Sequence, residues 1–315
     1  MNREEISRWL LILQENICKE LESLDGTAKF VPDVWERKEG GGGISRVMEN
    51  GSIWEKGGIN HSAVFGAAPD FLFKEGNHSL AAAGNTKAEF FATGLSIVLH
   101  PRNPWVPIIH SNIRYFELSD GTRWLGGGID LTPHYVCKKE AAVFHCELQK
   151  VCLRHDPNYY NNFKAQADHY FYLPHRNETR GIGGIFFDRL SGNSDKEFLQ
   201  ILEFWKEVGQ VFAPLYARLV QEKRDMAYGE KELAWQRLRR SRYVEFNLLY
   251  DKGTRFGLET NGRTESILMS LPPSAEWRYN YTPPDSSKES ETIAALKKGI
   301  NWVDETFTLP SLEKK

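Results

Sequence analysis

Polar side chains recur at every second position in two neighbouring stretches of the sequence that read as strands. Ser96 and His100 fall on one face of the first stretch, and His110, Asn112 and Arg114 share a face of the second. A single histidine in a strand is more often a structural residue than a functional one. Two histidines, a serine, an asparagine and an arginine on matched faces instead indicate a site.

A second polar stretch, residues 239–273, is rich in Tyr, Val, Phe, Ile and Thr, with breaks at 251–253 and 261–262. These breaks resemble hairpin turns, so the pattern predicts three consecutive strands. The turns would bring Asp251 close to Arg263. A solvated sheet edge with charged turns is an equally good interpretation of this pattern.

The elements that must position these residues belong to the α+β class. A strand, turn, strand, turn, strand pattern over 87–129 predicts an antiparallel meander, and strand character returns over 172–190. Apolar stripes at three- and four-residue spacing predict helices over 4–24, 137–154, 158–171, 195–222, 230–240 and 290–303. This order fits a single domain, residues 1–315, built around an antiparallel sheet.

Composition excludes several classes of function. The 315 residues carry 40 basic and 42 acidic side chains, so a net charge of −2 favours neither nucleic acid nor an anionic membrane as partner. No apolar run approaches the length of a membrane span. The first residues predict an amphipathic helix and no signal peptide, so we expect a cytoplasmic protein.

Motifs for organic cofactors and clusters are also missing from the sequence. The four cysteines form no Cys-x-x-Cys pair and lack iron–sulfur spacing. The glycines at 40–43 are not followed by Gly-Lys-Ser or Gly-Lys-Thr, which argues against a phosphate-binding loop. Those at 181–184 precede no helix pattern, which argues against a dinucleotide site.

Several of these stretches together resemble the oxygen-dependent coproporphyrinogen III oxidases of haem biosynthesis. Besides residues 239–273, the resemblance is carried by WER (35–37) with the glycines 40–43, EKGG (55–58), HPRNP (100–104), GGGIDLTP (126–133) and HRNETRGIGG (175–184). It covers the chain from about Trp35 to Val303. It implies a large antiparallel β-sheet flanked on both faces by α-helices, and a homodimer with residues 243–277 at or near the contact.

The resemblance also implies the reaction. Two propionate side chains of coproporphyrinogen III would be oxidatively decarboxylated to vinyl groups, giving protoporphyrinogen IX. O2 would be the co-substrate, and no organic cofactor would be needed because an electron-rich pyrrole can react with oxygen itself. Such chemistry needs guanidinium groups for carboxylates, a carboxylate for the pyrrole N–H groups and a cavity that excludes water.

Site roles carry over from the family residue by residue. Asp251 corresponds to the catalytic aspartate that binds the pyrrole nitrogens, and His110 to a catalytic proton donor. The implied substrate-binding residues are Ser96, Asn112, Ile113, Arg114, Asp130, Arg176, Arg180, Asn261, Gly262 and Arg263. Lys252 departs from the family's arginine: it keeps the charge but loses the planar fork.

Two questions stay open in the sequence. His100, His110, His145 and His175 match positions treated in bacterial relatives as ligands of a divalent metal such as manganese, although no two of them have short ligand spacing. The second question is function: a tetrapyrrole-binding or carrier protein on the same scaffold is the alternative, favoured by Lys252 alone.

Overall fold

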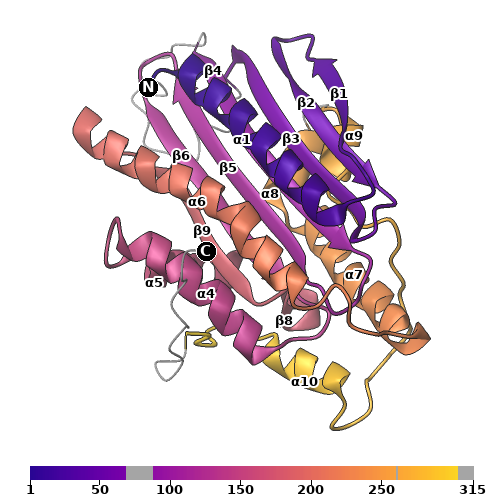
Figure 1. Ribbon diagram of the computed structural model, residues 1–315. Helices are drawn as coiled ribbons and strands as arrows, with labels where there is room; N and C mark the ends of the chain where they lie inside the picture. Colours follow the sequence, from indigo (N-terminus) through magenta and orange to yellow (C-terminus); the bar gives the residue numbers. More distant parts are fainter. Residues whose placement is uncertain (69–87, 260–261, 304–315) are drawn as a thin grey trace.

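A large antiparallel sheet forms the centre of the molecule in the computed structural model, which describes residues 1–68, 88–259 and 262–303 (Figure 1). In these residues the sheet has seven strands in the order β1-β2-β3-β4-β5-β6-β9. Their bounds are β1 (Val31–Glu36), β2 (Gly41–Glu49), β3 (Trp54–Ala67), β4 (Glu89–Pro101), β5 (Ile108–Leu118), β6 (Arg123–Thr132) and β9 (Gly183–Leu190). The meander predicted over 87–129 is confirmed by β4, β5 and β6, apart from residue 87, which lies outside the described residues.

One face of the sheet is covered by long amphipathic helices. Helices α1 (Arg3–Asp25) and α6 (Asp195–Gln221) lie along this face, with α4 (Lys138–Leu153) packed against α6 (Figure 1). Helix α5 (Tyr159–Tyr170) runs beside the edge strand β9. These four helices confirm the predictions over 4–24, 195–222, 137–154 and 158–171 within one or two residues at each end.

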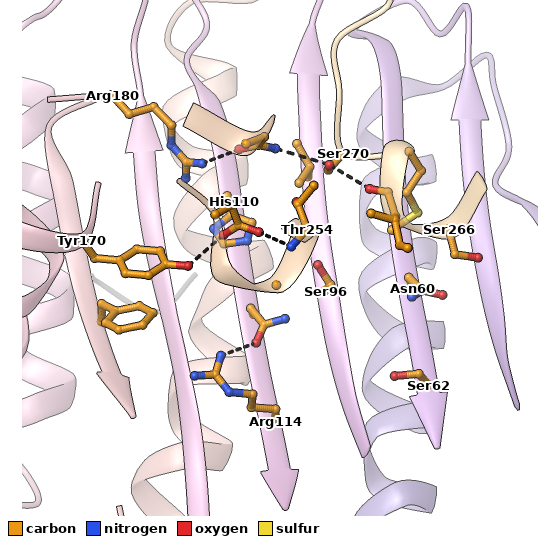
Figure 2. Close-up of a pocket in the computed structure, with 18 residues that line it drawn as sticks. Asn60, Ser62, Ser96, His110, Arg114, Tyr170, Arg180, Thr254, Ser266 and Ser270 are labelled. Carbon is orange, nitrogen blue, oxygen red and sulfur yellow. Dashed lines mark hydrogen bonds between the residues drawn. The ribbon is translucent and has the colours of Figure 1, made fainter. Parts of the chain in front are cut away.

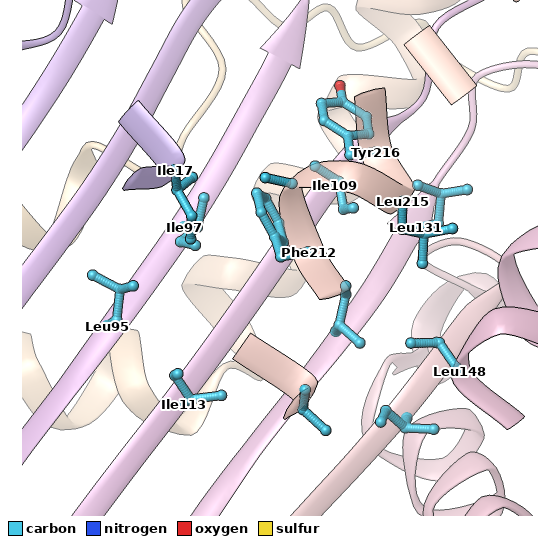
Figure 3. Packing of buried hydrophobic residues seen from close by; sticks show 14 of the residues in the cluster. Ile17, Leu95, Ile97, Ile109, Ile113, Leu131, Leu148, Phe212, Leu215 and Tyr216 are labelled. Atoms are coloured by element: carbon cyan, nitrogen blue, oxygen red, sulfur yellow. The ribbon is translucent and has the colours of Figure 1, made fainter. Parts of the chain in front are cut away.

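The main core fills the space between the sheet and these helices. Ile97 of β4, Ile109 of β5 and Phe212 of α6 all belong to this core, and their side chains are almost completely buried (Figure 3). Burying an aliphatic or aromatic side chain of this size stabilises the fold by about 1.5–3 kcal/mol. Because strand side chains alternate, the intervening residues of β4 and β5 must face the opposite side of the sheet.

That opposite face is covered by the segment predicted as three strands, and this prediction is wrong. Residues 239–273 contribute to α7 (Glu230–Leu249), α8 (Lys252–Glu259) and α9 (Thr264–Leu268). The helical period is visible in the buried residues Trp235, Leu238 and Phe246 of α7. It is obscured because charged residues such as Arg239 and Glu245 are also buried, through ion pairs, so polarity does not mark the solvent side.

Two further boundaries differ from the predictions. The last described helix, α10 (Lys288–Ala295), ends eight residues before 303. The strand predicted over 172–190 is divided into β7 (Tyr172–Leu173), the turn η1 (Pro174–Arg176), β8 (Glu178–Thr179) and β9. The described helices include none that is long and apolar enough to cross a membrane.

Candidate active site

A polar cavity of about 260 Å³ lies between the helices α8 and α9 and the face of the sheet opposite the main core (Figure 2). Its floor comes from alternate residues of three adjacent strands, because Asn60 of β3 pairs with Ser96 of β4, which pairs with Asn112 of β5. The matched polar faces predicted for β4 and β5 are therefore present. The other lining residues are Ser62, Val98, His110, Arg114, Tyr170, Arg180, Phe186, Asn247, Asp251, Gly253, Thr254, Ser266, Ile267, Met269 and Ser270.

His110 is held from behind by a buried ion pair. Its Nδ1–H donates to Asp130 at 2.7 Å, and the other carboxylate oxygen of Asp130 accepts from Arg180 at 2.7 Å. Burial alone would raise the pKa of Asp130, but Arg180 and His110 hold it below its ordinary value. Asp130 therefore remains ionised and holds Nδ1 of the His110 ring, which leaves Nε2 as the ring nitrogen available to other partners.

Arg180 makes its hydrogen bonds and ring contacts with other residues inside the protein. Its side chain is 2% exposed, and its guanidinium lies 4.5–4.6 Å from the ring centroids of Phe171, Tyr243 and Phe246. One amino group donates to Asp130 and the other donates to Asn247 at 2.9 Å. Such a fixed cation suits the task of holding a neighbouring side chain in place.

Arg114 is the more accessible of the two arginines that line the described cavity. Its side chain is 37% exposed and donates to Asp188 of β9 at 2.7 Å and to Asn112 at 3.1 Å. It crosses Gly126 of β6, the residue directly opposite in the sheet. A ligand carboxylate in the cavity can therefore bind the Arg114 guanidinium while Asp188 remains hydrogen-bonded to the same guanidinium.

Asp251 directly precedes α8 and lines the cavity. One carboxylate oxygen accepts from the Tyr170 hydroxyl at 2.9 Å, and the other accepts from the Thr254 backbone N–H at 2.7 Å. The second bond caps the helix, a role for which aspartate is strongly preferred. Lys252 is exposed and does not line the cavity.

Other predicted substrate residues lie outside the cavity lining. Arg176 makes two bonds to Glu245, at 2.8 and 2.6 Å, and Arg263 pairs with Asp33. Ile113 points into the core on the opposite face and is 2% exposed. The backbone N–H of Gly262 donates to the Gly257 carbonyl oxygen at 2.7 Å, and Asn261 lies outside the described residues.

The four histidines predicted as metal ligands are not brought together. His145 has both ring nitrogens engaged, with Nε2 donating to the Ile182 carbonyl and Nδ1 bonded to the Tyr160 hydroxyl, each at 3.0 Å. His175 is similarly occupied by Glu245 and Tyr250, and His100 donates to the Ser270 carbonyl at 2.8 Å. Within the described part of the chain, no group of three or more metal-ligating side chains is assembled. The four histidines therefore do not fit one shared metal centre in this chain.

Several lining residues were not predicted. Asn60 and Ser62 alternate along β3 in the same way as the polar residues of β4 and β5, so the period of two could have revealed them. Tyr170, Phe186 and Asn247 gave no such signal. They reach the cavity through the packing of α5, β9 and α7, which local sequence patterns do not specify.

A carboxylate, a histidine anchored through Nδ1 and an arginine converge on one polar cavity, an arrangement that suits acid–base chemistry on a carboxylate-bearing molecule. The family model described as coproporphyrinogen III oxidase matches residues 5–302 of the chain. The chain is also similar to "Coproporphyrinogen-III oxidase 1, chloroplastic" of Arabidopsis thaliana, with 43% identity covering 92% of this chain and 76% of that protein.

The chain therefore belongs to the oxygen-dependent coproporphyrinogen III oxidase family. Its reaction is the oxidative decarboxylation of two propionate side chains of coproporphyrinogen III to vinyl groups, which gives protoporphyrinogen IX in haem biosynthesis. The carrier alternative is not favoured by these similarities.

Proposed function

We propose that the cavity beneath α8 and α9 is where each propionate is oxidised. Asp251 accepts the pyrrole N–H groups, His110 transfers a proton, and Arg114 holds a carboxylate. The observation that carries this proposal is the convergence of these three side chains, from a helix start and one strand, on the same cavity. Ser96 and Asn112 supply hydrogen-bonding groups on its floor.

The chemistry requires acids and bases at defined places. For each propionate, the chain carboxylate loses CO2, one hydrogen leaves the neighbouring carbon and two electrons pass to O2. The balance is carboxylate plus O2 plus a proton, giving vinyl, CO2 and hydrogen peroxide. A proton must therefore be delivered, and His110, with Nδ1 fixed by Asp130, can exchange it through Nε2.

Asp130 and Arg180 support this site from behind. We assign both to the positioning of His110, because Asp130 is 1% exposed and is absent from the cavity lining, while both amino groups of Arg180 are hydrogen-bonded inside the protein. Arg176, Gly262 and Arg263 can meet a substrate only where it extends beyond the lining. The cavity volume of about 260 Å³ supports such an extension. Pockets that hold drug-sized ligands have volumes of about 300–1,000 Å³, and a tetrapyrrole is at least as large as such a ligand, so part of it must lie outside this cavity.

The role of Asp251 is tested by Asp251→Asn, which keeps the ability to cap α8 but removes the charge. We expect kcat to fall about a hundredfold or more at unchanged thermal stability. Asp120→Asn, in an exposed hairpin turn, is the matched control. Wild-type turnover in Asp251→Asn would remove Asp251 from the mechanism.

For cofactors, we propose that O2 is the electron acceptor and that no organic cofactor takes part. We also propose that the four histidines do not bind a shared catalytic metal, because His145 has no free ring nitrogen. Metal-stripped protein should keep its oxygen uptake and CO2 release, with no gain when manganese is added. Activity that returns only with manganese would reinstate a metal.

We further propose a homodimer with a contact that involves residues 243–277. Exposed apolar side chains support this assignment: Leu248, Leu249 and Trp277 are 43%, 52% and 54% exposed. Leu249→Glu should shift the protein toward monomer in sedimentation experiments. Leu199→Glu on α6, at 47% exposure, should leave the oligomeric state unchanged. A monomeric wild type would refute the proposal.

The domain organisation and location complete the proposal. One main core extends from α1 to Trp302, which supports a single domain over 1–315 and predicts one cooperative unfolding transition. We propose a cytoplasmic location, and α1 belongs to the folded domain because Ile6, Leu10 and Ile17 are buried in that core. Recovery of the native protein from a membrane-bounded compartment would contradict this location.

A further inference from the structure

Tyr170 touches the proposed catalytic aspartate from a separate element. It is the last residue of α5, and its hydroxyl donates to the Asp251 carboxylate at 2.9 Å (Figure 2). The same hydroxyl oxygen accepts from the backbone N–H of Lys252 at 3.2 Å. One hydroxyl thus holds both the carboxylate and the first backbone amide of α8.

The ring of Tyr170 is itself held in place. It stacks on Phe186 with centroids 4.2 Å apart and planes 9° apart, and it meets the rings of Phe171 and Phe246 edge-on at 5.0 and 5.7 Å. Aromatic pairs of this kind stabilise each other beyond simple burial. The hydroxyl is therefore presented to Asp251 at a fixed point.

The protonation state of the Tyr170 hydroxyl and the lone pairs of the Asp251 carboxylate both suit a positioning role for Tyr170. Burial, followed by the neighbouring charge of Asp251, raises the pKa of Tyr170, so the hydroxyl remains a donor. Tyr170 and the Thr254 N–H each occupy one oxygen of Asp251. A carboxylate offers about four lone-pair positions, so each oxygen keeps one for a donor from the cavity.

We propose that Tyr170 is a positioning residue for Asp251, which turns the carboxylate so that both oxygens can accept pyrrole N–H groups at once. This inference rests on the role proposed above for Asp251. Tyr170 itself exchanges no proton with the substrate. Its contribution is to hold the carboxylate, and the first turn of α8 that carries it, in the orientation the reaction needs.

The test is a double-mutant cycle with Tyr170→Phe and Asp251→Ala. Phenylalanine keeps the stack on Phe186 and removes only the hydroxyl. We expect kcat to fall about tenfold, the size expected for a hydrogen bond to a charged group, with KM changed less than about twofold. In the Asp251→Ala background, whose residual turnover is followed over hours, Tyr170→Phe should cause no further loss.

A control separates this effect from the loss of any buried hydroxyl. Tyr216→Phe removes a hydroxyl that donates to the Pro107 carbonyl at 2.8 Å on the opposite, core side of the sheet, and it should leave kcat unchanged. Wild-type kcat in Tyr170→Phe, or the same tenfold loss with and without Asp251, would overturn the inference. Wild-type turnover in Asp251→Ala would instead overturn the role of Asp251 and the inference with it.

Discussion

At the scale of single residues, a glycine beside the cavity is as important as the side chains that line it. Gly126 stands between Arg114 and Asp188, and a Cβ built on it would lie 2.8 Å from Arg114 Nε and 2.8 Å from Asp188 Oδ1. Both atoms are ends of side chains, so they would move aside and the sheet would stay in place. The glycine therefore allows the ion pair that sets the direction of Arg114.

Gly126→Ala should therefore displace Arg114 without unfolding the protein. We expect KM for coproporphyrinogen III to rise about tenfold with a smaller change in kcat, because a carboxylate contact is lost or tilted. Steady-state kinetics and thermal unfolding measure the two effects. Gly229→Ala, where the added Cβ meets its nearest atom at an ordinary 3.6 Å, is the control. An unchanged KM in Gly126→Ala would mean that Arg114 does not bind the substrate carboxylate.

At the scale of elements, a hydrogen-bonded bridge connects the floor of the cavity to its cover. Asn247 of α7 accepts from Arg180 and donates to the Ser270 hydroxyl at 3.3 Å, just beyond the end of α9 (Figure 2). Ser270 in turn donates to the Ile267 carbonyl within the same segment. The position of α9 is thereby tied to the ion pair that holds His110.

Asn247→Ala should loosen both ends of this bridge. We expect faster amide exchange in 264–270 and a severalfold fall in kcat, because a buried Arg180 amino group loses its partner. Ser270→Ala removes the hydrogen bond between Asn247 and residue 270 and keeps the bond between Arg180 and Asn247. It should therefore reproduce the faster amide exchange with a smaller loss of kcat. Equal kinetic losses in both variants would show that the Arg180 end of the bridge has no separate effect on turnover.

The same elements show what the sequence could and could not predict. The part of the cavity floor that β4 and β5 supply was predicted, because a strand with one buried face alternates strictly, as the positions of Ser96 and His110 show. The helices that cover the cavity, α8, α9 and the part of α7 after residue 240, were not predicted. Helix α7 buries the charged residues Arg239, Arg240 and Glu245, whose ion-pair partners come from distant segments of the sequence. Asp251 did carry a local signal for a helix start, since aspartate with a free N–H three residues later is the usual helix cap.

At the scale of the whole molecule, Glu245 ties together segments that are far apart in the sequence. Its carboxylate accepts from His175 and Arg176 of η1, from Arg242 of α7 and from the Trp277 indole N–H. Burial alone would raise the pKa of Glu245, but these donors lower it from 4.5 to about 2. The folded protein thus binds a proton here less readily than the unfolded chain.

This difference predicts a defined loss of stability in acid. Because the folded pKa is lowered, the stabilisation is fully present above about pH 4.5 and is lost as the pH falls toward 2. The gap corresponds to up to about 3 kcal/mol. Glu245→Gln should lower the free energy of unfolding by about that amount at pH 7, and its difference from wild type should shrink steadily below pH 4.5. Urea unfolding at pH 7, 5, 4 and 3 measures this, with Glu276→Gln, in an exposed ion pair, as a control expected to change little. A constant difference at every pH would show that Glu245 stabilises the fold by its shape and hydrogen bonds alone, independently of its charge.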